Sequence, residues 1–147
     1  MTPTRHTVIS AVTSVGFFYF TQSLIGTATC FFAGILIDLD HILDFLIEKK
    51  RLPFNYADLW SFCAYEKAGK LYLILHSYEF FVVWWFLVVY YHLNYFWLGL
   101  MVGMTVHMLA DQISNPCKPW AYFLLCRFKH GFSKELILNE KFYKTLK

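Results

Sequence analysis

Residues 6–37 read HTVISAVTSVGFFYFTQSLIGTATCFFAGILI and contain no Asp, Glu, Lys or Arg. A second uncharged run lies between Glu79 and Asp111. A stretch of about 18 apolar residues is typical of one membrane span, so each run is too long for one span and short for two full ones. Each run also has a weak break near its middle, at residues 21–23 and 92–94. We therefore predict that each run forms a helical hairpin.

The apolar pattern of the second run extends back through Glu79. The first helix of that hairpin is therefore predicted over residues 71–91, a length of roughly 32 Å, which is enough to span a bilayer. The other three core helices are expected to have about 15 residues, or roughly 22 Å. Helices of that length sit deep in one leaflet or cross where the bilayer thins.

Three further segments have the aromatic or amphipathic character of short interfacial helices, at residues 56–65, 120–132 and 133–146. We predict a single all-α domain over residues 1–147, a membrane-embedded bundle of two hairpins with about four core helices. The alternative for the first run is a cleaved signal peptide. Its apolar stretch is far longer than the core of such peptides, and no clean cleavage site follows it.

The composition excludes several classes of protein. Hydrophobic residues make up 58% of the chain, aromatic residues 21% and charged residues 16%, a balance opposite to that of disordered chains. The net charge of +3 is too small for a nucleic-acid-binding field, so no nucleic acid partner is expected. The four cysteines form no CxxC pair and indicate neither a disulfide framework nor a cysteine zinc site.

The charges also predict the orientation. The hairpin tips carry no Lys or Arg, and all 13 basic residues lie before, between or after the hairpins. The positive-inside rule places those segments on the cytoplasmic side. We expect a multi-pass protein of a bacterial inner membrane, in contact with membrane lipids. The sequence does not define its oligomeric state.

The ionisable residues collect at the predicted cytoplasmic ends of the four core helices. They are His6, Asp38, Asp40, His41, His76, Glu79, His107 and Asp111. His107 and Asp111 are four residues apart and share a helix face, and the pairs Asp38–His41 and His76–Glu79 are three apart. Imidazole and carboxylate groups suit a divalent ion, zinc first and also manganese or iron.

We predict that His6, Asp38, His41, His76, His107 and Asp111 ligate one to three ions. Asp40 or Glu79 is predicted to orient or deprotonate a metal-activated water. Each residue also has a structural interpretation. His107 could be a core histidine and His6 a surface residue of a frayed terminus. His41 could be a loop or capping histidine, and Glu79 could pair with a lysine. The aspartates, Asp44 above all, could be a solvated helix end. His92 and His130 are predicted to lie outside the site.

A pattern of five motifs resembles the YdjM-like membrane-bound metal-dependent hydrolases over residues 6–116. The motifs are His6, Gly-x-x-x-Asp-x-Asp-His at residues 34–41, His76-Ser77, His-x-x-x-Asp at residues 107–111 and Asn115-Pro116. That family is distantly similar to the zinc-dependent phospholipase C and single-strand nuclease group. The resemblance implies an α-helical bundle with hydrolase activity and a metal site at the six predicted ligands, with Asp40 also on the motif.

The sequence departs from this family in two places. Ile37 replaces a proline common before Asp-x-Asp-His, and the His-Arg pair common before His-Ser is absent. Glu79 could replace a ligand from that pair, and Arg127 or a loop lysine could replace its cation. This departure bears on the substrate more than on the metal.

The leading hypothesis is a membrane-embedded hydrolase that cleaves a phosphoester, with a lipid headgroup or another amphiphile as substrate. The first alternative is a metal-binding membrane protein without turnover, such as a sensor or a metallated scaffold. A metal or proton conductor ranks lower, because the ionisable residues gather at one end of the helices. A purely structural or partner-binding membrane protein would bind no metal.

Overall fold

The computed structural model describes residues 3–52 and 55–146, and among them it contains helices and no strand. The prediction of an all-α fold is confirmed. The chain forms two compact units. Unit 1 comprises Met1–Ile37 and Glu79–Asn115, and unit 2 comprises Asp38–Tyr78 and Pro116–Lys147.

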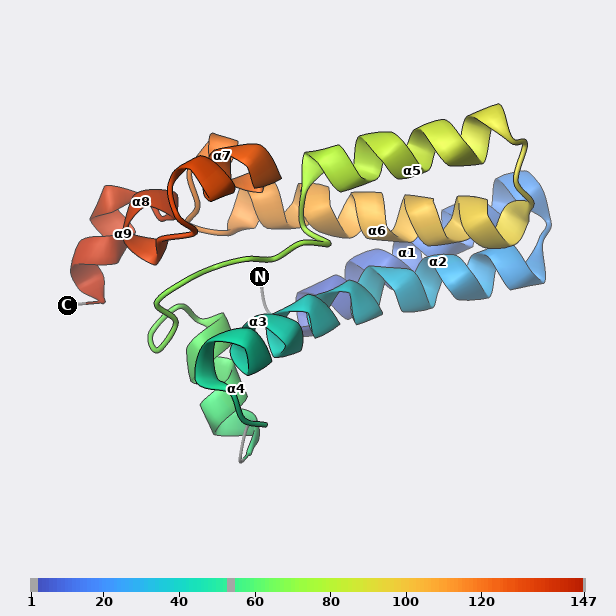
Figure 1. The fold of residues 1–147 in the computed structure, drawn as a ribbon. Coiled ribbons are helices and arrows are strands. Elements are labelled where there is room, and N and C mark those ends of the chain that lie inside the picture. The colour runs from blue at the N-terminus through green and yellow to red at the C-terminus, as the bar shows by residue number, and fades with distance from the viewer. Residues whose placement is uncertain (1–2, 53–54, 147) are drawn as a thin grey trace. The chain divides into compact units, whose positions relative to one another are not determined.

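Unit 1 is built from the predicted hairpins, α1 (Pro3–Thr21) with α2 (Leu24–Leu36) and α5 (Tyr78–Tyr90) with α6 (Tyr95–Ser114), which run side by side (Figure 1). Both predicted breaks are confirmed. Gln22 ends α1 with a φ of 50°, and the Ser23 side chain caps α2 by accepting a hydrogen bond from the backbone N–H of Gly26. At the second break His92 has a φ of 47°, and Asn94 caps α6.

Small residues bring α2 and α6 into close contact. A Cβ atom added to Gly103 would overlap the carbonyl oxygen of Cys30, and one added to Gly99 would overlap that of Gly26. On the other side of α2, a Cβ at Gly34 would meet the Ser10 hydroxyl of α1. Only glycine permits this backbone approach, so the three helices pack through it in a fixed register.

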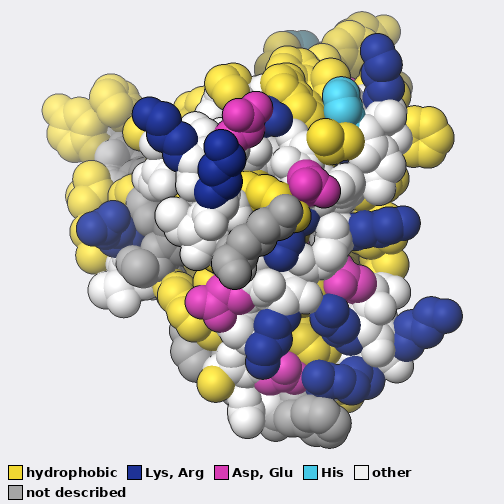
Figure 2. Space-filling model, turned by 90° about the vertical axis from the view of Figure 1, so that its left-hand side faces the viewer, with side chains coloured by type: hydrophobic (Ala, Val, Ile, Leu, Met, Phe, Trp, Pro, Cys, Tyr) yellow, Lys and Arg dark blue, Asp and Glu magenta, His cyan; other side chains and the backbone are white. Residues whose placement is uncertain are grey.

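The charged residues are divided very unevenly between the units. Only Arg5, Glu79 and Asp111 lie in unit 1, so the other 12 basic and 8 acidic residues lie in unit 2. Figure 2 shows a face over which Lys and Arg side chains are scattered among acidic and apolar ones. The helices of unit 1 instead expose large apolar side chains. Val12, Tyr19 and Phe20 of α1 are 69–84% exposed, and Val82 of α5 is 68% exposed.

By length and composition, α6 is the one helix among the described residues that is long and apolar enough to cross a membrane. The helix predicted over residues 71–91 is wrong in its first third, because α5 begins only at Tyr78 and has 13 residues. Conversely, α1 with 19 residues and α6 with 20 are longer than predicted.

Unit 2 contains short helices around a small core. They are the 3₁₀ turn η1 (Ile37–Leu39), α3 (Asp40–Lys49), α4 (Tyr56–Cys63), the 3₁₀ turn η2 (Pro119–Tyr122), α7 (Leu124–Lys129), α8 (Lys134–Ile137) and α9 (Glu140–Thr145). The core includes Phe45 of α3, Phe62 of α4 and Leu138 after α8. Short helices are therefore confirmed in the three segments where we predict interfacial ones.

Residues 69–76 form a non-helical segment, here called the strap, which is tied to α3 by carboxylates. Asp40, Asp44 and Glu48 are spaced by four and share one face of α3. Glu48 accepts hydrogen bonds from the backbone of Gly69 and Lys70, Asp44 from that of Tyr72 and Leu73, and Asp40 from that of Leu75. Backbone N–H groups held in this way are not available to a helix, which explains why α5 starts late.

Candidate metal centres

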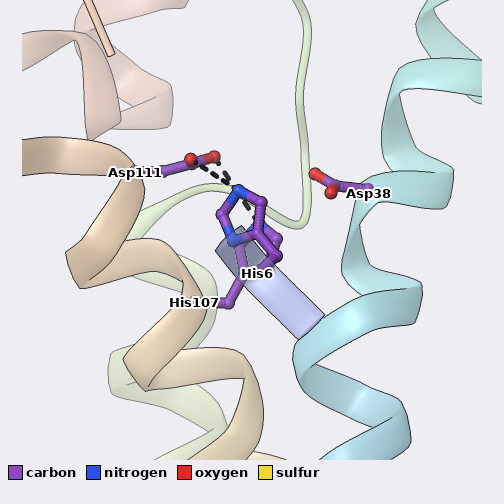
Figure 3. Close-up of side chains that lie close together, drawn as sticks. All are labelled: His6, Asp38, His107 and Asp111. Atoms are coloured by element: carbon purple, nitrogen blue, oxygen red, sulfur yellow. Dashed lines mark ion pairs between the residues drawn. The ribbon is translucent and has the colours of Figure 1, made fainter. Parts of the chain in front are cut away.

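The predicted ligands fall into two groups, one in each unit. The α1–α6 group of unit 1 consists of His6, His107 and Asp111. Nε2 of His6 lies 3.0 Å from one carboxylate oxygen of Asp111, and Nε2 of His107 lies 3.5 Å from the other (Figure 3). Each residue offers a ligand atom, and these atoms lie within 4.8 Å of one another. The predicted meeting of the start of α1 with the end of α6 is thereby confirmed.

Burial makes the α1–α6 group unusual. All three residues are at most 2% exposed, and the two imidazole rings stack with centroids 3.7 Å apart. Nδ1 of His6 is buried and makes no hydrogen bond to any residue within the described ranges. A polar atom buried in this state costs free energy. Two imidazoles and one carboxylate close together are a donor set that fits a divalent cation.

The packing of unit 1 orients His107. Gly99, Gly103, His107 and Asp111 follow one another at intervals of four along α6, so the face that contacts α2 continues into the ligands. Nδ1 of His107 lies 2.6 Å from the carbonyl oxygen of Gly34 on α2. A carbonyl only accepts hydrogen bonds, so Nδ1 carries the proton and Nε2 is the nitrogen available to a metal.

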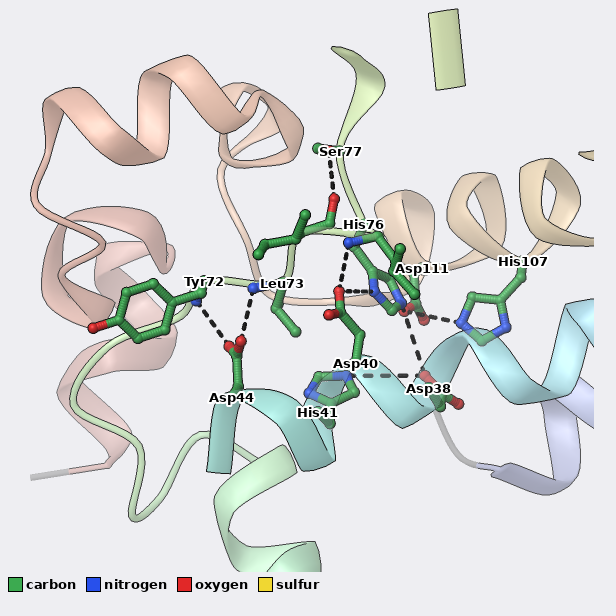
Figure 4. Close-up of polar contacts among 12 residues, drawn as sticks. Asp38, Asp40, His41, Asp44, Tyr72, Leu73, His76, Ser77, His107 and Asp111 are labelled. Atoms are coloured by element: carbon green, nitrogen blue, oxygen red, sulfur yellow. Dashed lines mark hydrogen bonds and ion pairs between the residues drawn. The ribbon is translucent and has the colours of Figure 1, made fainter. Parts of the chain in front are cut away.

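The α3 group of unit 2 consists of Asp38 in η1, His41 in the first turn of α3, and His76 at the end of the strap. Nε2 of His41 and Nε2 of His76 lie 3.9 Å and 3.8 Å from the same carboxylate oxygen of Asp38 (Figure 4). The three ligand atoms lie within 4.8 Å of one another. The predicted pairing of Asp38 with His41 is confirmed, whereas the prediction that His76 lies in a helix is wrong.

The two predicted catalytic carboxylates have different surroundings. Asp40 is 1% exposed, and its Oδ2 accepts a hydrogen bond from the backbone N–H of Leu75 and lies 3.3 Å from Nδ1 of His76. Glu79 is half-buried in the first turn of α5. Within the described part of the chain, it belongs to neither group of potential ligands.

Three residues of unit 2 have roles that the sequence did not predict. Asp44 is buried rather than part of a solvated helix end, and Glu48 holds the far end of the strap. Arg127, considered above as a substitute cation, is 1% exposed and donates a hydrogen bond to the carbonyl oxygen of His76. The four-residue spacing of Asp40, Asp44 and Glu48 is the signal that could have identified the carboxylate face of α3.

Asp44 is expected to make the stability of the protein depend on pH. Burial raises its pKa to about 6, although hydrogen bonds from the backbone of Leu73 and Tyr72 act in the opposite direction. A carboxyl group with a raised folded-state pKa stabilises the protein fully below its unfolded pKa, and this contribution is lost as the pH rises through 6.

Lowering the pH from 7.5 to 5 should therefore raise the free energy of unfolding of the wild type by about 1 kcal/mol relative to Asp44→Asn. Thermal unfolding of both proteins in detergent across this pH range measures the difference. Comparing the two proteins cancels the titration of the histidines, which they share. Parallel curves for the two proteins would contradict the prediction.

Comparisons with protein families, with curated proteins and with solved structures find no match to this chain.

Proposed function

We propose that this chain is a membrane-embedded, metal-dependent hydrolase that cleaves a phosphoester, with a lipid headgroup or another amphiphile as substrate. The observation that carries the proposal is the composition of the two groups. Each offers two imidazoles and one carboxylate with ligand atoms within 4.8 Å of one another. This donor set suits zinc, and also manganese or iron.

The number of protein ligands in the α3 group favours catalysis. Structural zinc sites are closed by four protein ligands, whereas catalytic sites have three and keep one position open. Asp38, His41 and His76 of the α3 group match the catalytic number. We assign His6, His107 and Asp111 to one ion and Asp38, His41 and His76 to another.

A bound divalent ion supplies an acidic water and stabilises charge on phosphoryl oxygens. The chain's own residues have separate tasks. The carbonyl of Gly34 fixes the ring of His107, and the carboxylate of Asp111 faces both histidines of its group. Of the two predicted proton acceptors, Asp40 already accepts a hydrogen bond from the backbone N–H of Leu75 and lies 3.3 Å from the ring Nδ1 of His76. We therefore assign the proton-accepting role to Glu79.

The charge division between the units supports insertion into a membrane. Unit 1 contains three charged residues and exposes large apolar side chains from α1, α2, α5 and α6, as expected of helices that face lipid. Unit 2 contains 12 of the 13 basic residues. By the positive-inside rule we place unit 2 on the cytoplasmic side of a bacterial inner membrane.

Metal binding without turnover is the second candidate, and the burial of the α1–α6 group favours it. A site whose three residues are at most 2% exposed resembles a structural or sensing site more than one that a substrate reaches. Asp38 of the α3 group is in contrast 34% exposed at its side chain. The two candidates predict the same metal content and differ only in turnover.

The first experiment is a measurement of metal content and hydrolysis. The protein is purified in detergent without a histidine tag, its metals are quantified by elemental mass spectrometry, and it is assayed on phospholipid vesicles and on a chromogenic phosphodiester. We expect about one zinc, manganese or iron ion per group and hydrolysis that a chelator abolishes and zinc restores. Metal without hydrolysis of any phosphoester would favour the second candidate, and the absence of metal after reconstitution would reject both.

A further inference from the structure

Asp40 lies directly against the ring of His76. Its side chain is 2% exposed, and its Oδ2 is 3.3 Å from Nδ1 of His76. The same oxygen accepts a hydrogen bond of 2.7 Å from the backbone N–H of Leu75 (Figure 4). We infer that Asp40 is a positioning residue, which holds the proton of His76 on Nδ1 and directs Nε2 toward Asp38 and His41. This inference rests on the proposed function in one respect, namely that Nε2 of His76 is a metal ligand.

The hydrogen-bond partners define which nitrogen carries the proton. An ionised carboxylate only accepts hydrogen bonds, and Oδ2 of Asp40 already accepts one from Leu75. Nδ1 of His76 must therefore be the donor in its contact with Asp40. The lone pair of the neutral ring is then on Nε2, which lies 3.8 Å from Oδ1 of Asp38. A carboxylate placed in this way behind a ligand histidine fixes the ring and increases its basicity.

A histidine of unit 1 is oriented in the same way, by a different hydrogen-bond acceptor. There the carbonyl oxygen of Gly34 lies 2.6 Å from Nδ1 of His107, and Nε2 of that ring faces Asp111. Each group thus has one histidine whose Nδ1 faces an acceptor and whose Nε2 faces a carboxylate. In unit 1 the acceptor belongs to the backbone, but in unit 2 it is a side chain. Of the two acceptors, Asp40 is therefore the one that can be replaced by mutation.

Asp40 acts on the ring and on the backbone beside it. Its carboxylate holds the N–H of Leu75 and the ring of His76, while Arg127 donates to the His76 carbonyl oxygen over 3.2 Å. The register of the strap on α3 therefore determines where the ring lies. A loss of Asp40 should loosen the ring even if the strap remains attached through Asp44 and Glu48.

Asp44 provides a matched control for this role. It lies one turn further along α3, is as buried as Asp40, and also binds two N–H groups of the strap. Both are backbone N–H groups, one of Tyr72 and one of Leu73. Replacing Asp44 therefore removes an attachment of the strap and leaves the contact between Asp40 and the ring of His76 in place. A purely structural role for Asp40 predicts that the two replacements behave alike.

The test compares Asp40→Asn, which keeps the shape and removes the charge, and Asp40→Ala with Asp44→Asn. Nitrogen NMR of protein labelled with ¹⁵N-histidine reports the tautomer of His76 in the metal-free state, and a His76→Asn variant assigns its signals. Competition with a zinc chelator measures the affinity of the α3 group for zinc. We expect the wild type to show the Nδ1–H form. Asp40→Ala should shift the proton toward Nε2, and Asp40→Asn should lower the zinc affinity about 10- to 100-fold.

Asp44→Asn should leave the tautomer unchanged and alter the zinc affinity less than about 3-fold, well below the loss expected when a residue that orients a metal ligand is removed. The inference is overturned if the wild type shows the Nε2–H form, if His76 keeps the Nδ1–H form in a folded Asp40→Ala variant, or if Asp44→Asn shifts the tautomer as much as Asp40→Ala. The tautomer is measured without metal. A chain that shows the expected tautomers but binds no zinc would therefore reject the proposed function and leave the role of Asp40 in place.

Discussion

Replacing His107 by alanine is expected to abolish metal binding by the α1–α6 group and all hydrolysis that depends on it. The change removes one of two imidazole ligands and leaves Asp111 buried with a single histidine beside it. Loss of a residue that only orients a metal ligand lowers metal affinity by about 10- to 100-fold, so loss of a ligand itself should lower the affinity by more than about 100-fold. The measurement is the number of zinc ions per chain by elemental mass spectrometry, together with hydrolysis of phospholipid vesicles. Asp111→Ala is expected to give the same result.

The control for this variant is His92→Asn. His92 is exposed in the connection between α5 and α6 and has a φ of 47°, a backbone conformation that asparagine tolerates. It lies in neither group of potential ligands, so its replacement should leave the metal content unchanged. An unaltered zinc content in His107→Ala, or an equal loss in His92→Asn, would show that the α1–α6 group is not the metal site.

The sequence predicted the helices of unit 1 where local chemistry determines their ends. The sequence predicts breaks at residues 21–23 and 92–94, and in the structure Ser23 and Asn94 are side-chain caps. Caps act within three residues of the helix that they begin. Their effect is therefore visible in a short stretch of sequence.

The strap could not be predicted in the same way. Residues 71–77 continue the apolar pattern of α5, and periodicity alone assigns them to that helix. Their backbone N–H groups instead bind Asp44 and Asp40, which lie 28 to 35 residues earlier in the chain. Contacts over that separation exist only in the folded chain. The local sequence pattern therefore does not predict these contacts.

The candidate ligands were identifiable because ionisable residues are rare in such apolar surroundings. The sequence did not show that these ligands are divided between two units. His6 and Asp111 are at opposite ends of unit 1 in the sequence, and the stripe of small residues on α2 and α6 brings them together. The GxxxG spacing of Gly99 and Gly103 predicted a close contact between helices. It did not identify Cys30 and Gly26 as the partners, because packing partners are a property of the tertiary structure.

Alanine at Gly103 is therefore expected to disrupt both the fold of unit 1 and its ligands. The added methyl group would overlap the backbone carbonyl of Cys30, and backbone cannot move aside as a flexible side chain does. We expect a loss of about 2–3 kcal/mol in stability, despite the higher helix propensity of alanine. Separation of α6 from α2 would also draw His107 away from the carbonyl of Gly34, so zinc affinity should fall. Thermal unfolding in detergent and zinc competition measure the two effects.

Gly16→Ala is the matched control, since Gly16 also lies inside a helix of unit 1 but a Cβ atom there would meet nothing within 4 Å. The same methyl group should leave zinc affinity unchanged and, through helix propensity, stabilise the protein by up to about 1 kcal/mol. Opposite signs for the two substitutions would attribute the loss at Gly103 to its contact with Cys30. Equal effects would mean that close packing between α2 and α6 does not hold His107 and Asp111 in place.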